Sequence, residues 1–389
     1  MSQVVPSPSA IQSAIALQPQ IREQAPEIDQ RRALPGELVE AMREAGLFHV
    51  LVPESVGGLQ CDPVVAAQVV EEVAAADGSA GWCVMIAAQN AGFAGFMDQD
   101  HARTVWGDGG IVCGTARPIG RAEETATPEH GHVVSGRWPF ASGSSHADWF
   151  AAESVVYAGG EPKRDGDGNE ITRVTLVPRS EVTIHDTWHT TGLRGTASND
   201  FSVDGAFVPH GRGFRMLAEE PQHPWEFYQA GPLNFINHGG HALGVARGAL
   251  ETVAGIAATK PAWGNQTVLR QELRVQNQYA EALALVESAR SYLYETSQAY
   301  WEQCLAGNFD DAMQRAKVRL ATSHAATASV RAVDILHHAM GTSGIFTKSP
   351  LERQFRDIHT AGAHVMISPL TYEAAGRVAL GLDAEFPFF

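Results

Sequence analysis

The sequence contains little cysteine and few basic residues. The cysteines are far apart and form no CxxC pair, so neither a zinc ribbon nor a disulfide framework is indicated, and a reducing cytoplasm fits best. They are Cys61, Cys83, Cys113 and Cys304. Lys and Arg number 28 against 44 Asp and Glu, which gives a formal net charge of −16. Nucleic acid and anionic membranes attract clustered basic residues, so neither is expected as the main partner.

Long apolar runs are also lacking. The most apolar stretch beyond the N-terminus, residues 82–88, is far shorter than the roughly 20 residues of a membrane-spanning helix. Residues 1–24 have no basic segment, and their apolar run AIAL is too short for a signal peptide. We therefore expect a cytoplasmic protein without a membrane partner.

The common motifs for nucleotides, hydrolysis and zinc are absent. The sequence has no GxxxxGK[ST] loop, no GxGxxG between a strand and a helix, no GxSxG elbow and no HExxH. The pairs His337/His338 and His238/His241 have no carboxylate or cysteine at ligand spacing, so no metal site is expected. A phosphate-bearing cofactor must therefore be held in another way.

The chain does contain three zones of hydrophobic periodicity. Residues 1–108 show helical spacing, residues 109–220 contain short β-branched and aromatic runs separated by turn residues, and residues 221–389 return to helical spacing. The predicted fold class is α+β. We expect an N-terminal helical domain, a central antiparallel β-barrel-like domain and a C-terminal four-helix bundle, divided at these boundaries.

Two helical patterns support this division. Pro35 can open a helix, and Gly46 is its expected end. In the last zone, an apolar stripe at helical spacing consists of Val275, Tyr279, Leu283, Val286 and Leu293. Long bundle helices often pack against neighbouring subunits, which favours a homo-oligomer.

The stretch WPFASGSSHADWF, residues 138–150, has small hydroxyl residues and glycine between aromatic residues. One interpretation is a strand, a tight turn and a second strand, since glycine and serine favour turns and aromatic residues favour strands. The other is a binding surface, because small residues let a flat ligand approach the backbone.

From Glu27 onward the chain resembles the acyl-CoA dehydrogenase superfamily. Within that superfamily, SGRWPFASGSSHADW (135–149) is similar to the branch of two-component flavin-dependent monooxygenases. The wider resemblance is carried by AMREAGLFHVLVPESVGGL (41–59), DTWHTTGLRGTASNDFSVDGAFVP (186–209) and MGTSGIFTKSPLERQFRDIHTAGAH (340–364).

The resemblance implies an oxygenase that uses reduced FMN or FAD and O2. Enzymes of this branch receive diffusible reduced flavin from a separate NAD(P)H-flavin reductase. They form a flavin C4a-hydroperoxide and hydroxylate phenols, secosteroids or indoles, and relatives oxidise sulfur or amino-sugar nitrogen. We therefore expect a homotetramer of the acyl-CoA dehydrogenase fold that hydroxylates a small, phenolic or indolic substrate.

The resemblance also implies where the flavin binds. Ser142 matches the hydroxyl near flavin N5, and Phe140 and Trp149 are expected to form apolar walls that keep water out. The matching flavin-lining positions elsewhere are Thr115, Thr196 and Ser198. The run that contains Thr196 and Ser198 could instead be a glycine-rich hairpin turn. Arg353 and Arg356 are candidates for the flavin phosphate or a subunit contact, and Arg356 also fits a structural ion pair with Asp357.

His364 is the expected catalytic residue besides Ser142. It matches the histidine between flavin and substrate in this branch, where an imidazole that titrates near neutrality can act as base or hydrogen-bond partner. The alternative is a helix histidine bonded to a neighbouring carbonyl, and His359 is expected to be structural. Asn90 lies at or near the position where some relatives have another active-site histidine. Trp82, Asn90 and Phe235 are expected to line the substrate pocket.

Two other functions remain open. An acyl-CoA dehydrogenase or a nitroalkane-type oxidase needs a carboxylate base over the flavin. The stretch 358–372, where many dehydrogenases carry it, contains no acid, and GTARPIGRA (114–122) replaces their TExGxGSD-like loop. The third possibility is a non-catalytic bundle scaffold that has lost its flavin.

Overall fold

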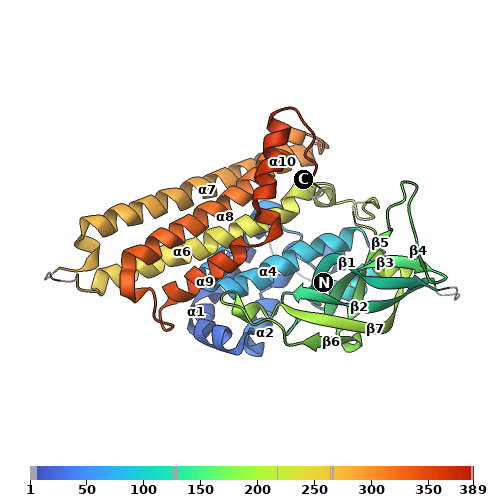
Figure 1. Cartoon of the computed structure of the whole chain (residues 1–389), viewed down its shortest axis with the longest axis horizontal. Coiled ribbons are helices and arrows are strands. Elements are labelled where there is room, and N and C mark those ends of the chain that lie inside the picture. The colour runs from blue at the N-terminus through green and yellow to red at the C-terminus, as the bar shows by residue number, and fades with distance from the viewer. Residues whose placement is uncertain (1–6, 126–129, 217, 263, 265–266, 387–388) are drawn as a thin grey trace.

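Helices occupy the two ends of the chain and strands occupy its middle, as the periodicity predicts (Figure 1). The computed structural model describes residues 7–125, 130–216, 218–262, 264, 267–386 and 389. The predicted boundary near residue 108 falls between the last N-terminal helix and the first strand, and that near residue 220 follows the last strand. The division into domains at these points stays a prediction.

One of the N-terminal helices is apolar almost all round. This helix, α4, is buried against α3, α6 and β1. Asp62 and Asp77 cap α3 and α4 by accepting hydrogen bonds from Val64 N (2.9 Å) and Ala80 N (3.0 Å). The first helix lies in the zone predicted to be helical and contains Pro19 and Pro26. The bounds are α1 Ser7–Arg31, α2 Gly36–Glu44, α3 Pro63–Ala76, α4 Gly78–Asn90 and α5 Gln99–Trp106.

The middle of the chain forms one sheet of eight strands. The strand order is β6-β7-β2-β1-β3-β5-β8, and β4 pairs with β3. All recorded pairs are antiparallel except β1 with β3, so the expectation of an entirely antiparallel sheet is wrong at this pair. The strands are β1 Val112–Glu124, β2 Gly131–Ala141, β3 Trp149–Ala158, β4 Glu161–Pro162, β5 Thr172–Pro178, β6 Val182–His185, β7 Asn199–Pro209 and β8 Gly213–Phe214.

The parallel pair has a topological cause. β2 and β3 follow each other in the chain but lie on opposite edges of β1. Residues 142–148 therefore cross the end of β1 instead of closing a hairpin. Asp148 N and Trp149 N donate to Ile111 O at 2.9 and 3.1 Å, which fixes the crossing. The small residues of the stretch 138–150 are thus part of a crossover connection.

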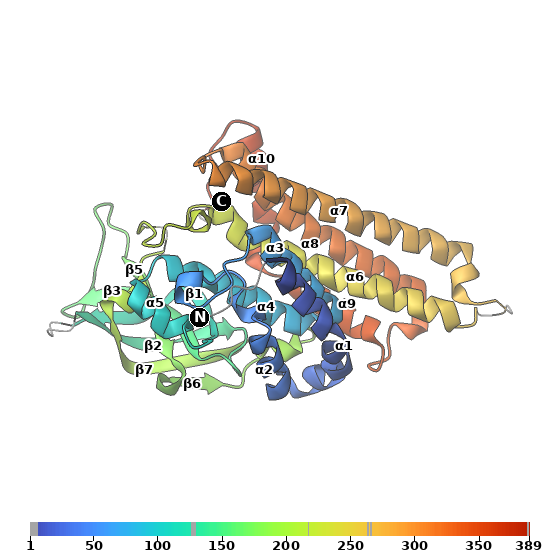
Figure 2. The ribbon, with the colours of Figure 1, turned by 180° about the vertical axis from the view of Figure 1, so that it is seen from behind.

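The C-terminal helices form the bundle. The long helices α6, α7 and α8 lie side by side in both views, and α9 packs on α6 and α8 (Figures 1 and 2). Val275, Val286 and Leu293 of the predicted stripe are buried, but Leu283 is 40% exposed. None of the described helices is long and apolar enough to cross a membrane. The bounds are α6 Ile236–Thr259, α7 Leu273–Leu305, α8 Ala312–Met340, α9 Pro350–Gly362 and α10 Pro369–Ala379.

The sheet has a hydrophobic core of its own. Trp138 stacks on Phe201 with ring centroids 5.2 Å apart, and Phe150 contacts Phe201 at 5.1 Å. Trp138 Nε1 also donates to the carbonyl of Glu153 at 2.7 Å. Two aromatic residues of the stretch 138–150 therefore stabilise the sheet, and the small residues between them are held at the end of β1.

Gly114 provides a test of the parallel pairing. It has φ +135°, and a Cβ there would lie 2.2 Å from the carbonyl oxygen of Ala151 on β3. We expect Gly114→Ala to lower the free energy of unfolding by about 1–3 kcal/mol. The control is Gly255→Ala on α6, where no atom lies within 4 Å of the added Cβ. Thermal unfolding should show a gain of about 0.5–1 kcal/mol for the control. Equal stability of the two variants would contradict this account.

Candidate active site

The side chains of Ser142, Ser198 and Thr196 form a buried chain of hydrogen bonds. The Oγ atoms of Ser142 and Ser198 lie 2.7 Å apart, and Ser198 Oγ lies 2.7 Å from Thr196 Oγ1. Thr196 Oγ1 donates to the Leu193 carbonyl at 2.8 Å. Because each hydroxyl has one proton, Ser198 must donate to Thr196 and Ser142 must donate to Ser198. The sequence predicted these residues, and the structure brings them together.

Local backbone geometry places these hydroxyls. A bulge in β2 puts Phe140 at φ 64°, and the loop before β7 has Leu193 at φ 49° and Ala197 at φ 45°. These left-handed conformations are uncommon for residues with a side chain. Gly143 N donates to Thr196 O at 2.7 Å and joins the two segments. The run that contains Thr196 and Ser198 lies in the loop that joins the antiparallel neighbours β6 and β7, so it is part of a long hairpin connection and also carries two members of the hydroxyl chain.

Trp82 of α4 connects the hydroxyl chain to a group of imidazoles. Its Nε1 donates to Ser142 Oγ at 3.1 Å. Its ring centroid lies 5.7 Å from that of His238, 5.1 Å from that of His241 and 5.6 Å from that of His364. Ser142 Oγ thus accepts one hydrogen bond and donates one, which leaves one lone pair for a further donor.

His364 lies just after the end of α9. Its Nδ1 accepts a hydrogen bond from Met366 N at 3.3 Å, and its ring stacks on His238 with centroids 4.6 Å apart. Burial, together with the positive charge of Arg319, lowers the pKa of His364 to about 4. The expectation of an imidazole that titrates near neutrality is wrong, and the ring is neutral at pH 7. The alternative of a helix histidine bonded to a carbonyl is not observed.

His238 and His241 belong to this site although the sequence indicated only that they do not bind metal. They lie three residues apart on one face of α6, and both are buried. Their spacing on one helical face was the sequence signal that could have identified them as neighbours. His238 Nε2 pairs with Gln89 Oε1 at 3.1 Å and His241 Nε2 with Gly78 O at 2.8 Å. Burial lowers the pKa of both rings.

The other predicted site residues are more dispersed. Asn90 Nδ2 donates to Val112 O at 3.0 Å and ties α4 to β1. Trp149 is half-buried, with the Arg212 guanidinium 5.2 Å from its ring. Phe140 is 55% exposed, and its ring contacts that of Trp188 edge-on at 6.3 Å. Thr115 is half-buried on β1, beside a register shift. The flavin contacts of these residues stay predictions.

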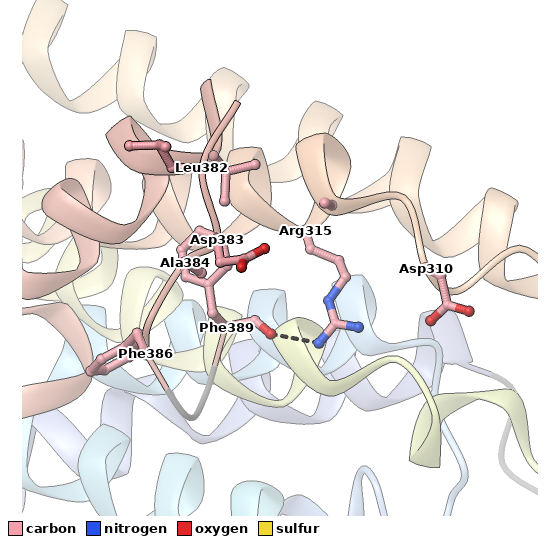
Figure 3. Close-up of a pocket in the computed structure, with 9 residues that line it drawn as sticks. Asp310, Arg315, Leu382, Asp383, Ala384, Phe386 and Phe389 are labelled. Carbon is pink, nitrogen blue, oxygen red and sulfur yellow. Dashed lines mark hydrogen bonds between the residues drawn. The ribbon is translucent and has the colours of Figure 1, made fainter. Parts of the chain in front are cut away.

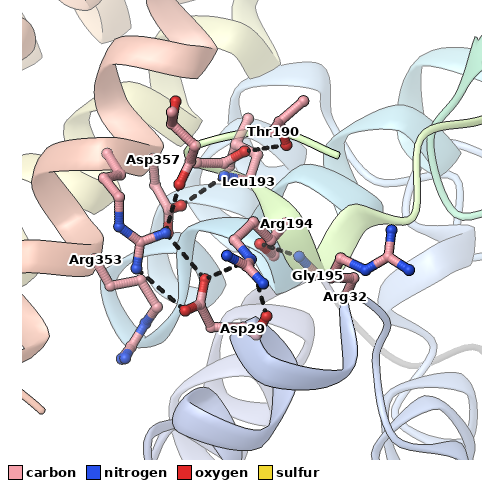
Figure 4. Close-up of polar contacts among 12 residues, drawn as sticks. Asp29, Arg32, Thr190, Leu193, Arg194, Gly195, Arg353 and Asp357 are labelled. Atoms are coloured by element: carbon pink, nitrogen blue, oxygen red, sulfur yellow. Dashed lines mark hydrogen bonds and ion pairs between the residues drawn. The ribbon is translucent and has the colours of Figure 1, made fainter. Parts of the chain in front are cut away.

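Arg356 lies in an ion-pair network that includes Asp29, and Figure 4 shows the polar contacts around Asp29. Its Nη1 and Nη2 donate to Asp29 at 3.0 and 3.1 Å, and its Nε donates to Glu352 at 2.6 Å. These carboxylates favour the structural interpretation over a flavin phosphate, although the partner is not the adjacent Asp357. Asp357 instead accepts from Leu193 N at 2.6 Å, and so supports the loop that carries Thr196.

Arg353 and His359 also have carboxylate partners. Arg353 Nε lies 3.3 Å from Asp77 Oδ2, which joins α9 to the start of α4. His359 Nε2 pairs with Asp334 at 2.8 Å, which fits the structural role expected for it.

Two hollows of about 240 Å³ lie outside the hydroxyl chain. One is at the C-terminal end, where Arg315 donates to Phe389 O (Figure 3). The other borders the loop before β7 and is lined by Arg31, Arg32, Ala33, Ser145, Ile184, Asp186, Trp188, Ala197 and Asn199. The second hollow therefore places two arginines beside the segment that carries Ser198.

No carboxylate contacts Ser142, Trp82 or His364 in the hydrogen bonds and ring contacts of the described residues. Within the same part of the chain, no group of three His, Cys, Asp or Glu side chains could hold a metal ion. The site offers hydroxyl, indole and neutral imidazole groups, which suit hydrogen bonding to a ring-shaped ligand.

The chain is similar to known flavin enzymes along most of its length. Residues 15–98 match the N-terminal domain of acyl-CoA dehydrogenase, and residues 236–369 match its C-terminal domain. The chain is 30% identical over 363 residues to the indole-3-acetate monooxygenase of Pseudomonas putida, covering 91% of this chain and 89% of that protein. It is 26% identical to the oxygenase component of the FADH2-dependent resorcinol hydroxylase of Rhizobium sp., covering 94% and 92% of the two chains.

A solved structure shows the same fold. The crystal structure of the HsaA monooxygenase from M. tuberculosis superimposes with a TM-score of 0.87 at 26% sequence identity. The match covers 99% of this chain and 100% of that one.

Asp357 predicts a pH dependence of stability. Burial and the nearby Asp77 raise the pKa of Asp357 from 3.8 to about 7. The folded state therefore binds more protons than the unfolded state between these values, so stability is lost as the pH rises toward about 7. Asp357→Asn keeps the acceptor for Leu193 N. We expect its melting temperature relative to the wild type to be higher at pH 8 than at pH 5, by about 2 °C or more.

The control for this measurement is Asp204→Asn, at an exposed position on β7. If the difference in melting temperature between Asp357→Asn and the wild type stays constant from pH 5 to pH 8, the raised pKa of Asp357 is refuted.

Proposed function

Because the chain belongs to the acyl-CoA dehydrogenase superfamily and to its flavin-dependent monooxygenases, we propose that it hydroxylates a small phenolic or indolic compound with reduced flavin and O2. The observation that carries the proposal is the buried hydroxyl chain that ends at Ser142, beside Trp82 and the neutral His364. Reduced flavin, when bound, supplies the two electrons with which one oxygen atom of O2 enters the substrate while the other leaves as water.

The hydroxyl chain fits the reduced form of the cofactor. Ser142 commits its proton to Ser198, so toward a ligand its oxygen can only accept. Reduced flavin has an N–H at N5 that can donate to Ser142, whereas oxidised flavin has a bare acceptor nitrogen there. Ser142, Ser198 and Thr196 would hold this edge of the ring, and Trp82 keeps Ser142 in place.

His364 would act on the substrate as a neutral group. With its pKa near 4, its free nitrogen can accept a hydrogen bond from a phenol or indole at neutral pH. Trp82 and His238 pack against its ring and exclude water from that side. His364 would therefore orient the substrate and take up its proton transiently, without being charged at rest.

The dehydrogenase alternative lacks its central residue. Proton removal next to a thioester carbonyl needs a carboxylate base, and no described acid contacts His364 or Ser142. A nitroalkane-type oxidase has the same requirement. We therefore place oxygenation ahead of both reactions.

The partner proteins are part of the proposal. The oxygenase would receive reduced FMN or FAD from a separate NAD(P)H-flavin reductase, in a reducing cytoplasm. A homotetramer is supported by exposed apolar side chains on the bundle and on α10, which include Leu273 (80% exposed) and Leu305 (55%) as well as Leu370 (47%).

Isotope labelling tests the function. The protein is mixed with reduced FMN or reduced FAD, ¹⁸O2 and a panel of phenols and indoles, and the products are analysed by mass spectrometry. We expect one ¹⁸O atom in the product and a preference for one flavin. His364→Ala should lower product formation by about 100-fold or more, with hydrogen peroxide as the alternative product. If no substrate gains labelled oxygen and the flavin oxidises at its free rate, the proposal fails.

Ser142 is tested by anaerobic flavin titration. Ser142→Ala should weaken the binding of reduced flavin by about 3- to 10-fold and leave oxidised flavin unchanged, because only N5–H donates to this oxygen. The control is Ser145→Ala, three residues away at an exposed position. An equal loss for both redox forms would show that Ser142 acts through the fold. Thermal unfolding of each variant checks that it remains folded.

A further inference from the structure

We propose that Arg319 binds a carboxylate on the aromatic substrate, so that the site is selective for aryl acids. This inference rests on the proposed function, since it identifies the substrate class of the same site. It assigns to α8 a specificity-determining residue that the sequence did not single out.

Arg319 is a buried cation without a carboxylate partner. Its side chain is 0% exposed. Nη2 donates to Met366 O at 2.9 Å, whereas Nε and Nη1 have no hydrogen-bond partner among the described residues. The described part of the chain gives it no ion pair, and burial is the single cause that lowers its pKa to about 10. The guanidinium therefore stays charged at neutral pH.

An isolated buried charge is expensive, and proteins normally pair such groups. This chain does so elsewhere: the buried Glu71, 1% exposed, is paired with Arg247 and Arg290, and Tyr294 also donates to it. The guanidinium fork of Arg319 matches two carboxylate oxygens. Nη2 keeps a second hydrogen, so a ligand carboxylate could bridge Nη2 and one of the two unpartnered nitrogens, and it would neutralise the charge.

Arg319 lies beside residues of the candidate active site. Its guanidinium carbon lies 4.6 Å from the ring centroid of Phe235, which the sequence predicted as a pocket residue. Met366, whose carbonyl it holds, is the residue whose N–H donates to His364. The positive charge of Arg319 also lowers the pKa of His364, which shows that the two groups interact.

This arrangement orients a substrate. Trp82 contacts both Ser142 and the ring of His364. Met366 contacts both His364 and Arg319, and the guanidinium of Arg319 lies over the ring of Phe235. An aromatic ring beside His364 could then place its acidic side chain toward Arg319 and its reactive carbon toward the flavin. His364 is the partly exposed member of this group, so we expect the ligand to enter past it.

Matched acid and amide ligands test the inference. The probes are phenylacetate, 4-hydroxyphenylacetate and indole-3-acetate, each compared with its neutral amide. Binding is measured by calorimetry, without flavin and with reduced FMN under anaerobic conditions. We expect the wild type to bind at least one acid about 10- to 100-fold more tightly than its amide. If the wild type favours no acid over its amide, the inference is wrong.

Variants separate ligand binding from a structural role. Arg319→Gln should abolish the preference for the acid and change the affinity for the amide by less than about 3-fold. Arg319→Lys should retain a reduced preference, because it keeps the charge and loses the fork. The control is Arg331→Gln on the same helix, where the side chain is 65% exposed. If Arg319→Gln does not fold, the inference is tested with Arg319→Lys, whose preference for the acid should be smaller than that of the wild type. An equal loss for acid and amide would overturn the inference.

The experiments distinguish a failure of the proposed anion site from a failure of the proposed oxygenase function. Tight acid binding that depends on Arg319, without ¹⁸O transfer, would refute the oxygenase and keep the anion site. Oxygen transfer to neutral phenols or indoles, with no acid preference, would keep the oxygenase and refute the role of Arg319.

Discussion

The hydrogen bonds from the Trp82 indole through Ser142, Ser198 and Thr196 to the Leu193 carbonyl hold three distant parts of the chain together. Trp82 belongs to the helical part, Ser142 to the crossover after β2, and the other residues to the loop before β7. Each hydroxyl in this series of hydrogen bonds can donate in only one direction, since the last acceptor is a carbonyl. The Ser142 oxygen therefore presents an acceptor toward a ligand, and in the proposed function this acceptor would favour the reduced flavin, which has an N–H at N5.

Backbone strain at the site is offset by its surroundings. Leu193 and Ala197 adopt left-handed conformations that cost of order 1–3 kcal/mol each. The loop that contains them is fixed by Asp357, which accepts from Leu193 N, and by Ser79, which accepts from Gly195 N at 3.1 Å. Asp357 is on α9 and Ser79 on α4, so helices from both ends of the chain position the hydroxyls of Thr196 and Ser198.

Charge is distributed unevenly around this site. The outer networks, such as Arg356 with Asp29 and Glu352, are balanced pairs that hold elements together. Inside, the imidazoles are neutral and Arg319 is the cation without a counter-ion among the described residues. In the proposed site, neutral rings would limit the binding of water and protons near the substrate, and the unpaired guanidinium would favour an anionic ligand.

The sequence by itself determined the order of helices and strands, the family and the hydroxyl residues Ser142, Thr196 and Ser198, because periodicity and local motifs are properties of neighbouring residues. Tertiary structure decided the parallel β1–β3 pair, the partners of Arg356, the lowered pKa of His364, the ring contact between His238 and His364, and the burial of Arg319 without a counter-ion among the described residues. These features depend on burial and on contacts between residues far apart in the chain. Spacing along one sequence does not contain that information.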